Sequence, residues 1–279
     1  MTNELLDAIS SNATDRKPLV WLDSEAYGRR VVLNGTPLPW NKPTEFISAY
    51  GQIQSLLKPG VAPVNLGHSL SAWLNANQGV LSEMGGKKRI RYALRKLLAM
   101  DSHRTLIREI VSGLCQSVSQ PLVLVLPANG HLINWANQMA NSAPVADISD
   151  VDVDTVSVYL ADYLRNFNGL DVAGVLVQVP DGTAINPEFL ELYSPIVNVA
   201  KHYHWTLGMQ VSAGTVSDPD ETLQFVITDE AQQVSTGVIQ KDSFWSGEEA
   251  HWRSPGFVYA EVPEDLDPEQ VLERLSTLR

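Results

Sequence analysis

Three polar residues in this sequence carry side chains that could move protons or bind an anion. His68 follows the apolar stretch 61–66, and histidine titrates near neutral pH, so His68 could serve as a general acid or base. Arg29 could hold a substrate carboxylate through two parallel hydrogen bonds. Asp181, which follows the apolar run 172–179, could bind substrate or orient His68. We predict that these three are the catalytic residues.

Each of the three also has a structural interpretation that the sequence leaves open. His68 could be a histidine that is hydrogen-bonded within a loop. Arg29 could form a salt bridge with Glu25 or Asp23. Asp181 precedes a glycine, and an Asp-Gly pair is itself a turn signal.

Four further polar residues lie where predicted strands end or just beyond. Active sites of α/β barrels lie at the C-terminal ends of the strands, so we predict that these residues bind substrate. They are Asp23, Arg30, His131 and Asp229.

The elements that must position these residues alternate between helix and strand. Apolar residues recur every three or four positions from 153 to 167, which predicts a helix that ends near Gly169. The almost unbroken apolar run 172–179 predicts a strand buried on both faces, as in a parallel sheet. About seven strands are expected, near residues 18, 61, 121, 172, 206, 223 and 256. The polar stretch 230–254 is expected to be a long loop, or a short helix and a loop.

This succession predicts an α/β fold, a TIM-type (β/α)8 barrel that is complete or lacks one element. No internal repeat, low-complexity tract or linker divides the sequence, so residues 1–279 are expected to form a single barrel domain. The basic run 87–96 lies between two predicted strands. Its cations could bind phosphate or an acid, or they could form the solvated face of an amphipathic helix.

Composition and charge exclude several classes of function. A formal net charge of -12 argues against a nucleic-acid partner. The N-terminus carries Glu4 and Asp7 and lacks the layout of a signal peptide, and no apolar run approaches the roughly 20 residues that span a bilayer. We therefore expect a cytoplasmic protein with a small-molecule substrate and no membrane partner, and a homodimer is compatible with this interpretation.

The sequence offers few ligands for a metal or cofactor. Its single cysteine, Cys115, excludes an internal disulfide and a multi-cysteine zinc site. His202 and His204 diverge if they lie on a helix, which favours a solvated or packed pair over metal ligands. Neither the dinucleotide-binding motif G-x-G-x-x-G nor the P-loop motif G-x-x-x-x-G-K-S/T occurs in the sequence. We therefore expect no metal and no cofactor.

Four segments of the chain occur in an order that one group of barrels shares. They are residues 5–10 with 18–22 and Gly28-Arg29; 121–126 with the helix after it; 159–164 with 175–181 and 186–189; and 258–262 with 266–271. In this order they resemble the uroporphyrinogen decarboxylase superfamily, which includes corrinoid-linked methyltransferases and is similar to cobalamin-independent methionine synthase. Each segment is a weak signal alone, and the order carries the resemblance.

The resemblance implies a cofactor-independent lyase of the decarboxylase type that acts by acid/base chemistry on a small carboxylated or aromatic substrate. Arg29 would fix an anionic group, His68 would move the proton, and Asp181 would position the substrate or the base. Arg29 matches one of the family's substrate-binding arginines, whereas Asp23 and Ser24 stand where another would be.

Two alternative functions remain open. The chain could be a divergent, non-catalytic barrel that acts as a binding or assembly partner, or a methyltransferase with a corrinoid or folate donor. An enclosed pocket with convergent polar groups at the barrel mouth would favour the enzyme, whereas a mouth filled by residues 230–254 would favour the partner.

Overall fold

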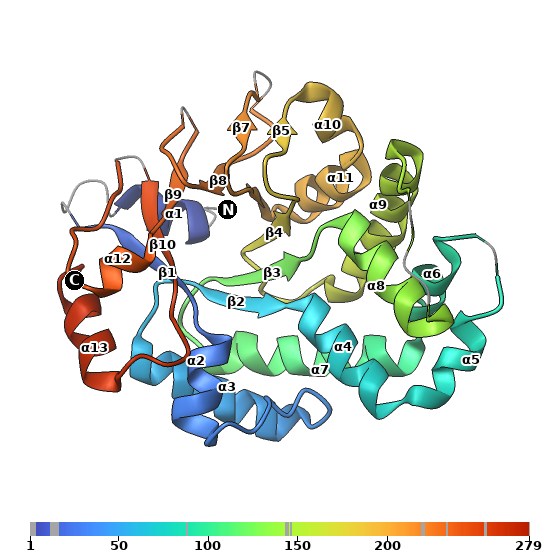
Figure 1. Cartoon of the computed structure of the whole chain (residues 1–279), viewed down its shortest axis with the longest axis horizontal. Helices are drawn as coiled ribbons and strands as arrows, with labels where there is room; N and C mark the ends of the chain where they lie inside the picture. The colour runs from blue at the N-terminus through green and yellow to red at the C-terminus, as the bar shows by residue number, and fades with distance from the viewer. Residues whose placement is uncertain are drawn as a thin grey trace.

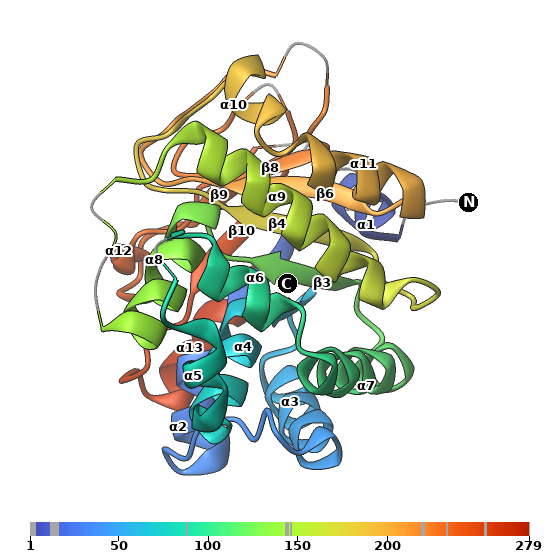
Figure 2. The ribbon, with the colours of Figure 1, turned by 90° about the vertical axis from the view of Figure 1, so that its right-hand side faces the viewer.

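The computed structural model describes residues 4–11, 17–87, 89–142, 145, 147–218, 221–232, 234–253 and 256–278. Eight parallel strands curl into a nearly closed barrel with helices around it (Figures 1 and 2). Around the sheet the strands follow the order β1 (Leu19–Asp23), β10 (Gly256–Glu261), β9 (Thr236–Ile239), β8 (Phe225–Thr228), β6 (Thr206–Gln210), β4 (Gly174–Gln178), β3 (Leu122–Leu126) and β2 (Ala62–Asn65). The predicted TIM-type α/β barrel is confirmed in an incomplete form, because β1 and β2 leave one seam open.

The helices follow the strands along the chain. In chain order they are α1 (Glu4–Ser11), α2 (Glu25–Leu33), α3 (Pro43–Leu57), α4 (Leu66–Ala76), α5 (Leu81–Met84), α6 (Tyr92–Leu98), α7 (Asp101–Ser117), α8 (Asn129–Asn141), α9 (Asp150–Leu164), α10 (Pro187–Glu191), α11 (Ser194–Tyr203), α12 (Asp242–Trp245) and α13 (Pro268–Ser276). The long helices α3 and α7 pack against each other (Figure 2). Two short strands, β5 (Ala184–Ile185) and β7 (Thr215–Val216), pair outside the barrel.

One strand of the barrel was not predicted from the sequence. Residues 230–254 were expected to be irregular, yet they contain β9 as well as α12. Strand β9 reads Thr-Gly-Val-Ile, so it has too few apolar residues to stand out as a buried run. The other seven strands lie where the apolar runs predicted them.

Side chains alternate along the strands between the barrel interior and the surrounding helices. On β1, Leu19 and Trp21 belong to the interior cluster, whereas Val20 and Leu22 pack against the outer helices. The next inward position is Asp23, the last residue of the strand. The alternation therefore turns a carboxyl group into the C-terminal mouth of the barrel.

Aromatic rings fill the interior where two strands carry glycine. A Cβ atom at Gly208 of β6 would lie 2.2 Å from Cζ of Phe225, and one at Gly237 of β9 would lie 2.3 Å from Cε2 of Phe257. Leu5 of α1 packs into the same cluster. Among the described residues, the end of the barrel opposite the mouth is therefore a solid apolar core, and the space for a ligand lies toward the mouth.

The sequence of β2 explains why this strand lies at an edge of the sheet, where the seam with β1 opens. Strand β2 contains Pro63, which has no N–H group and is tolerated mainly at sheet edges. Near the start of the seam the N–H of Gly60 donates to the carbonyl of Val20 at 2.7 Å. Farther along, the Tyr50 hydroxyl of α3 donates to the carbonyl of Pro63 at 2.9 Å. A side chain of α3 thus takes the place of a neighbouring strand.

The basic run 87–96 leads into α6. The described part of α6 buries Ala93 and Leu97, while Lys96 pairs with Glu83 at 3.8 Å. This arrangement matches the amphipathic-helix interpretation of the run. No helix within the described residues is both long and apolar enough to cross a membrane.

Candidate functional site

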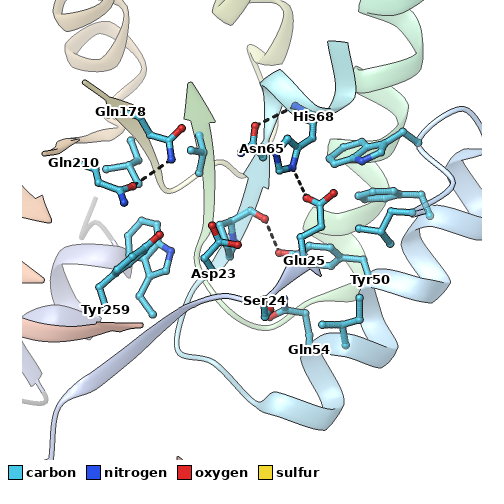
Figure 3. A pocket seen from close by; sticks show the side chains of 18 residues that line it. Asp23, Ser24, Glu25, Tyr50, Gln54, Asn65, His68, Gln178, Gln210 and Tyr259 are labelled. Atoms are coloured by element: carbon cyan, nitrogen blue, oxygen red, sulfur yellow. Dashed lines mark hydrogen bonds and ion pairs between the residues drawn. The ribbon is translucent and has the colours of Figure 1, made fainter. Parts of the chain in front are cut away.

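An enclosed pocket lies at the C-terminal mouth of the barrel and extends into the open seam (Figure 3). Helix α3 and the segment before it supply much of its apolar wall, through Trp40, Phe46, Tyr50 and Ile53. Strand ends and the starts of α2 and α4 supply its polar groups, among them Asp23, Glu25, Asn65, His68, Gln178 and Gln210. The pocket therefore combines an apolar slot in the seam with a polar mouth.

The polar groups of the mouth follow from the two-residue period of the strands. Gln178 comes two positions after buried Leu176 on β4, and Gln210 is its register partner on β6. The amide of Gln178 donates to Oε1 of Gln210 at 3.3 Å. On β2, Asn65 ends the strand and accepts a hydrogen bond from the backbone N–H of His68 at 3.1 Å, which caps α4.

His68 and Glu25 face each other across the mouth. Nδ1 of His68 lies 2.7 Å from Oε2 of Glu25, as the dashed line in Figure 3 marks. The hydrogen bond to the Glu25 carboxylate raises the pKa of His68, although its partial burial acts in the opposite direction. The imidazole therefore keeps its proton to a higher pH than a free histidine would.

Asp23 is a half-buried acid of the site. Burial raises the pKa of its carboxyl group, and the negative charges of Glu261 and Glu25 raise it further, whereas His68 lowers it. Asp23 and Glu261 are register partners on the adjacent strands β1 and β10, which explains why their charges interact. The mouth thus holds two titratable groups, Asp23 and His68, whose pKa values both lie above their ordinary values.

Two open grooves meet at His68. The first, of about 840 Å³, lies toward Arg29, Asn75 and Glu261. The second, of about 590 Å³, lies toward His131 and Asp181. The enclosed pocket itself measures about 50 Å³, which has room for a few water molecules. His68 lines all three spaces, so it lies where a bound compound would pass from groove to pocket.

The two predicted arginines hold a loop beside the mouth. Nη2 of Arg29 lies 2.7 Å from Oε1 of Glu264, so its salt bridge is to neither of the two acidic residues that the sequence offered. The Arg30 guanidinium donates to the backbone carbonyls of Glu264 and Leu266. Arg29 still lines the first groove, whereas Arg30 is engaged by the segment before α13.

The remaining predicted residues are spread over the mouth. His131 and the exposed Asp181 line the second groove together with His68. Gly182 has a φ of 74°, so the turn interpretation of the Asp-Gly pair holds. Glu25, not Asp181, contacts the His68 ring. The Asp229 carboxylate accepts a hydrogen bond from the backbone N–H of Ala213, away from the enclosed pocket.

Several residues of the site were not predicted from the sequence. Gln178, Gln210, Tyr259 and Glu261 were overlooked, and Glu25 was considered only as a partner for Arg29. A signal was available for three of them, because a polar residue at the last inward position of a strand must face the mouth. The sequence analysis instead selected residues in the loops beyond the strands, Asp181 and Asp229.

Within the part of the chain that the structure describes, no three His, Cys, Asp or Glu side chains gather closely enough to hold a metal ion. His202 packs against the ring of Tyr203 at 4.9 Å between centroids, and His204 ends α11 in the left-handed conformation.

Comparison with known proteins adds no name to this site. No protein-family model matches the chain, and no curated protein matches its sequence. The resemblance to the uroporphyrinogen decarboxylase superfamily therefore stays an inference from the order of four segments on a barrel fold.

Proposed function

We propose that this protein is an enzyme that performs acid/base chemistry of the lyase type on a small, ring-bearing substrate. The observation that carries the proposal is the His68–Glu25 pair at 2.7 Å beside the half-buried Asp23, in a pocket with aromatic walls. Sites that pair titratable groups of shifted pKa with a concave apolar pocket are typical of proton-transfer enzymes.

The roles follow from the two shifted pKa values. Glu25 favours the protonated imidazole, so His68 is suited to donate a proton as a general acid. The raised pKa of Asp23 brings this carboxyl group closer to the neutral range, where a general base or acid works best. Trp40, which lines both the enclosed pocket and the first groove, would hold the ring of the substrate, with its reacting group between Asp23 and His68.

The state of the mouth favours an enzyme over a binding partner. Among the described residues, the lining of the enclosed pocket includes none from 230–254, so this stretch does not fill the mouth. The convergent polar groups expected of a catalytic site are present instead.

Arg29 is engaged in a salt bridge and is not free to bind a substrate anion as the resemblance implies. To fix a substrate carboxylate it would first have to leave Glu264, with which it forms an exposed salt bridge at 2.7 Å. Exposed pairs of this kind contribute little, so the exchange is feasible, but it makes Arg29 a weaker candidate than His68 or Asp23.

Proton transfer can be tested without knowledge of the natural substrate. The protein is incubated in D2O with a panel of small aromatic carboxylic acids and aromatic ketones, and NMR follows deuterium incorporation and loss of the carboxyl group. We expect turnover of at least one compound, and we expect His68→Gln and Glu25→Gln to slow it by about 10²–10⁴-fold. His202→Gln, which changes a histidine on α11, is the matched control. Equal rates in all four proteins would refute the proposed roles.

A further inference from the structure

The first groove, between α2 and α4, carries an excess of negative charge. We call it the acidic groove; its charged lining residues are Asp23, Glu25, Arg29, His68 and Glu261. Its two cationic side chains each have an acidic partner already, since Arg29 pairs with Glu264 and His68 with Glu25.

Glu261 is left without a cation. It is the exposed last residue of β10, and among the described residues no ion pair to its carboxylate is found. Its register partner Asp23 points to the same face of the sheet. The charges of Glu261 and Glu25 make ionisation of Asp23 harder, so a cation placed between these three carboxyl groups would be stabilised by all of them.

A second observation, independent of these acids, also points to a ligand. Gln54 of α3 lines the enclosed pocket and is only 6% exposed. Its Oε1 is buried and has no hydrogen-bond partner among the described residues. A buried acceptor without a donor is costly, and a ligand that donates a hydrogen bond would remove this cost. The nearby Tyr50 hydroxyl cannot do so while it donates to Pro63.

We propose that the acidic groove and the enclosed pocket bind a protonated organic amine, with the ammonium beside Asp23, Glu25 and Glu261. The ring lies in the acidic groove against Trp40, and only a small hydrogen-bond donor of the ligand reaches into the enclosed pocket toward Gln54. This inference names a substrate class for the proposed function and rests on the same pocket. The ligand charge in this proposal is opposite to the one that the sequence resemblance implies. The resemblance implies an anion bound by Arg29, whereas the acidic groove would bind a cation beside Glu261.

An organic cation fits the groove better than a metal ion does. Within the described residues, no three acidic or histidine side chains converge closely enough to ligate a metal. Trp40 lines both the pocket and the groove, and an aromatic face attracts an ammonium group but does not ligate a metal. The enclosed pocket of about 50 Å³ is too small for the whole of a ring-bearing amine, so such a compound must extend into the acidic groove.

The test compares three probes that share one ring and differ in charge: benzylamine, benzyl alcohol and benzoate. Ligand-observed NMR gives their dissociation constants for the full chain at pH 7.5 and low salt. We expect benzylamine to bind at least tenfold more tightly than the other two, a difference of about 1.4 kcal/mol. Glu261→Gln should reduce this preference at least fivefold.

Glu273→Gln is the matched control, because it removes the same charge from an exposed position on α13 outside the groove. We expect it to leave the preference unchanged. The amine site is refuted if benzylamine binding is undetectable, if benzoate or benzyl alcohol binds equally well, or if both Gln variants weaken benzylamine equally. Binding does not require turnover. If benzylamine is preferred but no compound exchanges deuterium, benzylamine included, the acid/base function is refuted and the amine site stands.

Discussion

The imidazole of His68 and the carboxylate of Glu25 meet at 2.7 Å across the one open seam of the barrel. Glu25 begins α2, directly after β1, and His68 lies in the first turn of α4, directly after β2. The two edge strands do not pair with each other, so this contact joins their C-terminal ends through side chains instead. The seam that makes the barrel incomplete is also what allows a pocket to open beside the pair.

We predict that Glu25→Gln lowers the pKa of His68. In the wild type the hydrogen bond to Glu25 and its charge raise this pKa, while desolvation lowers it. When the Glu25 charge is removed, desolvation still lowers the pKa of His68 and only the charge of Asp23 still raises it, so we expect the pKa to fall from its wild-type value. Titration of the ring resonances by NMR measures the shift. The control is again Glu273→Gln, and a His68 pKa that is the same in all three proteins would contradict the prediction.

Asp23→Asn should stabilise the fold at the expense of the proposed chemistry. A raised pKa means that the folded state disfavours the Asp23 carboxylate, so the penalty is present above the folded pKa and vanishes as the pH falls below about 3.8. We expect the substitution to raise the free energy of unfolding at pH 8 by about 0.5–2 kcal/mol, a range that single stabilising substitutions commonly reach. Urea unfolding at pH 8 and at about pH 3.5, below the unfolded pKa of Asp23, measures it. A gain that is equal at both pH values, or a loss at pH 8, would show that Asp23 is not electrostatically frustrated.

The barrel could be predicted from the sequence because its strands are buried on both faces. Runs such as Leu122–Leu126 are wholly apolar, and none of the helices in the described part of the chain has a wholly apolar sequence. Strand β9 could not be found in this manner, since threonine and glycine occupy half of it. Gly237 is small because the ring of Phe257 needs the space, a tertiary reason that no local pattern contains.

The candidate site was harder to predict than the fold. His68 and Asp23 were identified because each ends an apolar run, and the structure brings them to the same pocket. The partner of His68 was not foreseen, because the meeting with Glu25 depends on which strands flank the seam. Arg29 illustrates the same difficulty, since its partner Glu264 is 235 positions away along the chain.

Gly208→Ala should lower the free energy of unfolding, because the barrel interior is tightly filled around Gly208. The added Cβ would lie 2.2 Å from the Phe225 ring, which has neighbours on its other sides in Trp21 and Phe257. We expect a loss of about 1–3 kcal/mol in unfolding free energy, the usual cost of overpacking a core. Urea unfolding provides the measurement.

Gly51→Ala is the matched comparison for this substitution. Gly51 lies within α3, and a Cβ there would meet no atom within 4 Å. Alanine is favoured over glycine in a helix, so we expect a gain of about 0.5–1 kcal/mol. A Gly208→Ala variant as stable as the wild type would mean that the barrel interior is not tightly filled at this site. Destabilisation by Gly51→Ala as well would mean that the loss at Gly208 cannot be assigned to overpacking.

His103 supplies a prediction about pH and stability away from the mouth. Its side chain is fully buried on α7, with Nε2 at 3.1 Å from the hydroxyl of Ser69 and Nδ1 at 3.4 Å from that of Tyr163. Desolvation, assisted by the charge of Arg104, lowers the pKa of His103 to about 4. The unfolded chain therefore binds a proton between about pH 6.5 and 4 that the folded protein does not, so stability falls as the pH drops through this window.

Replacement of His103 by glutamine should remove this loss. The variant is expected to be less stable than the wild type at pH 7, because the contacts with Ser69 and Tyr163 are disturbed. Between pH 7 and pH 4.5, however, the wild type should lose about 2–3 kcal/mol more than the variant does, since only the wild type has this buried site to protonate on unfolding. Urea unfolding at a series of pH values gives both curves, and the difference between them cancels the contribution of the carboxylates that titrate in the same range. Parallel curves would mean that His103 takes up its proton in the folded state, and that the contact between α4 and α7 behind His68 is open to water.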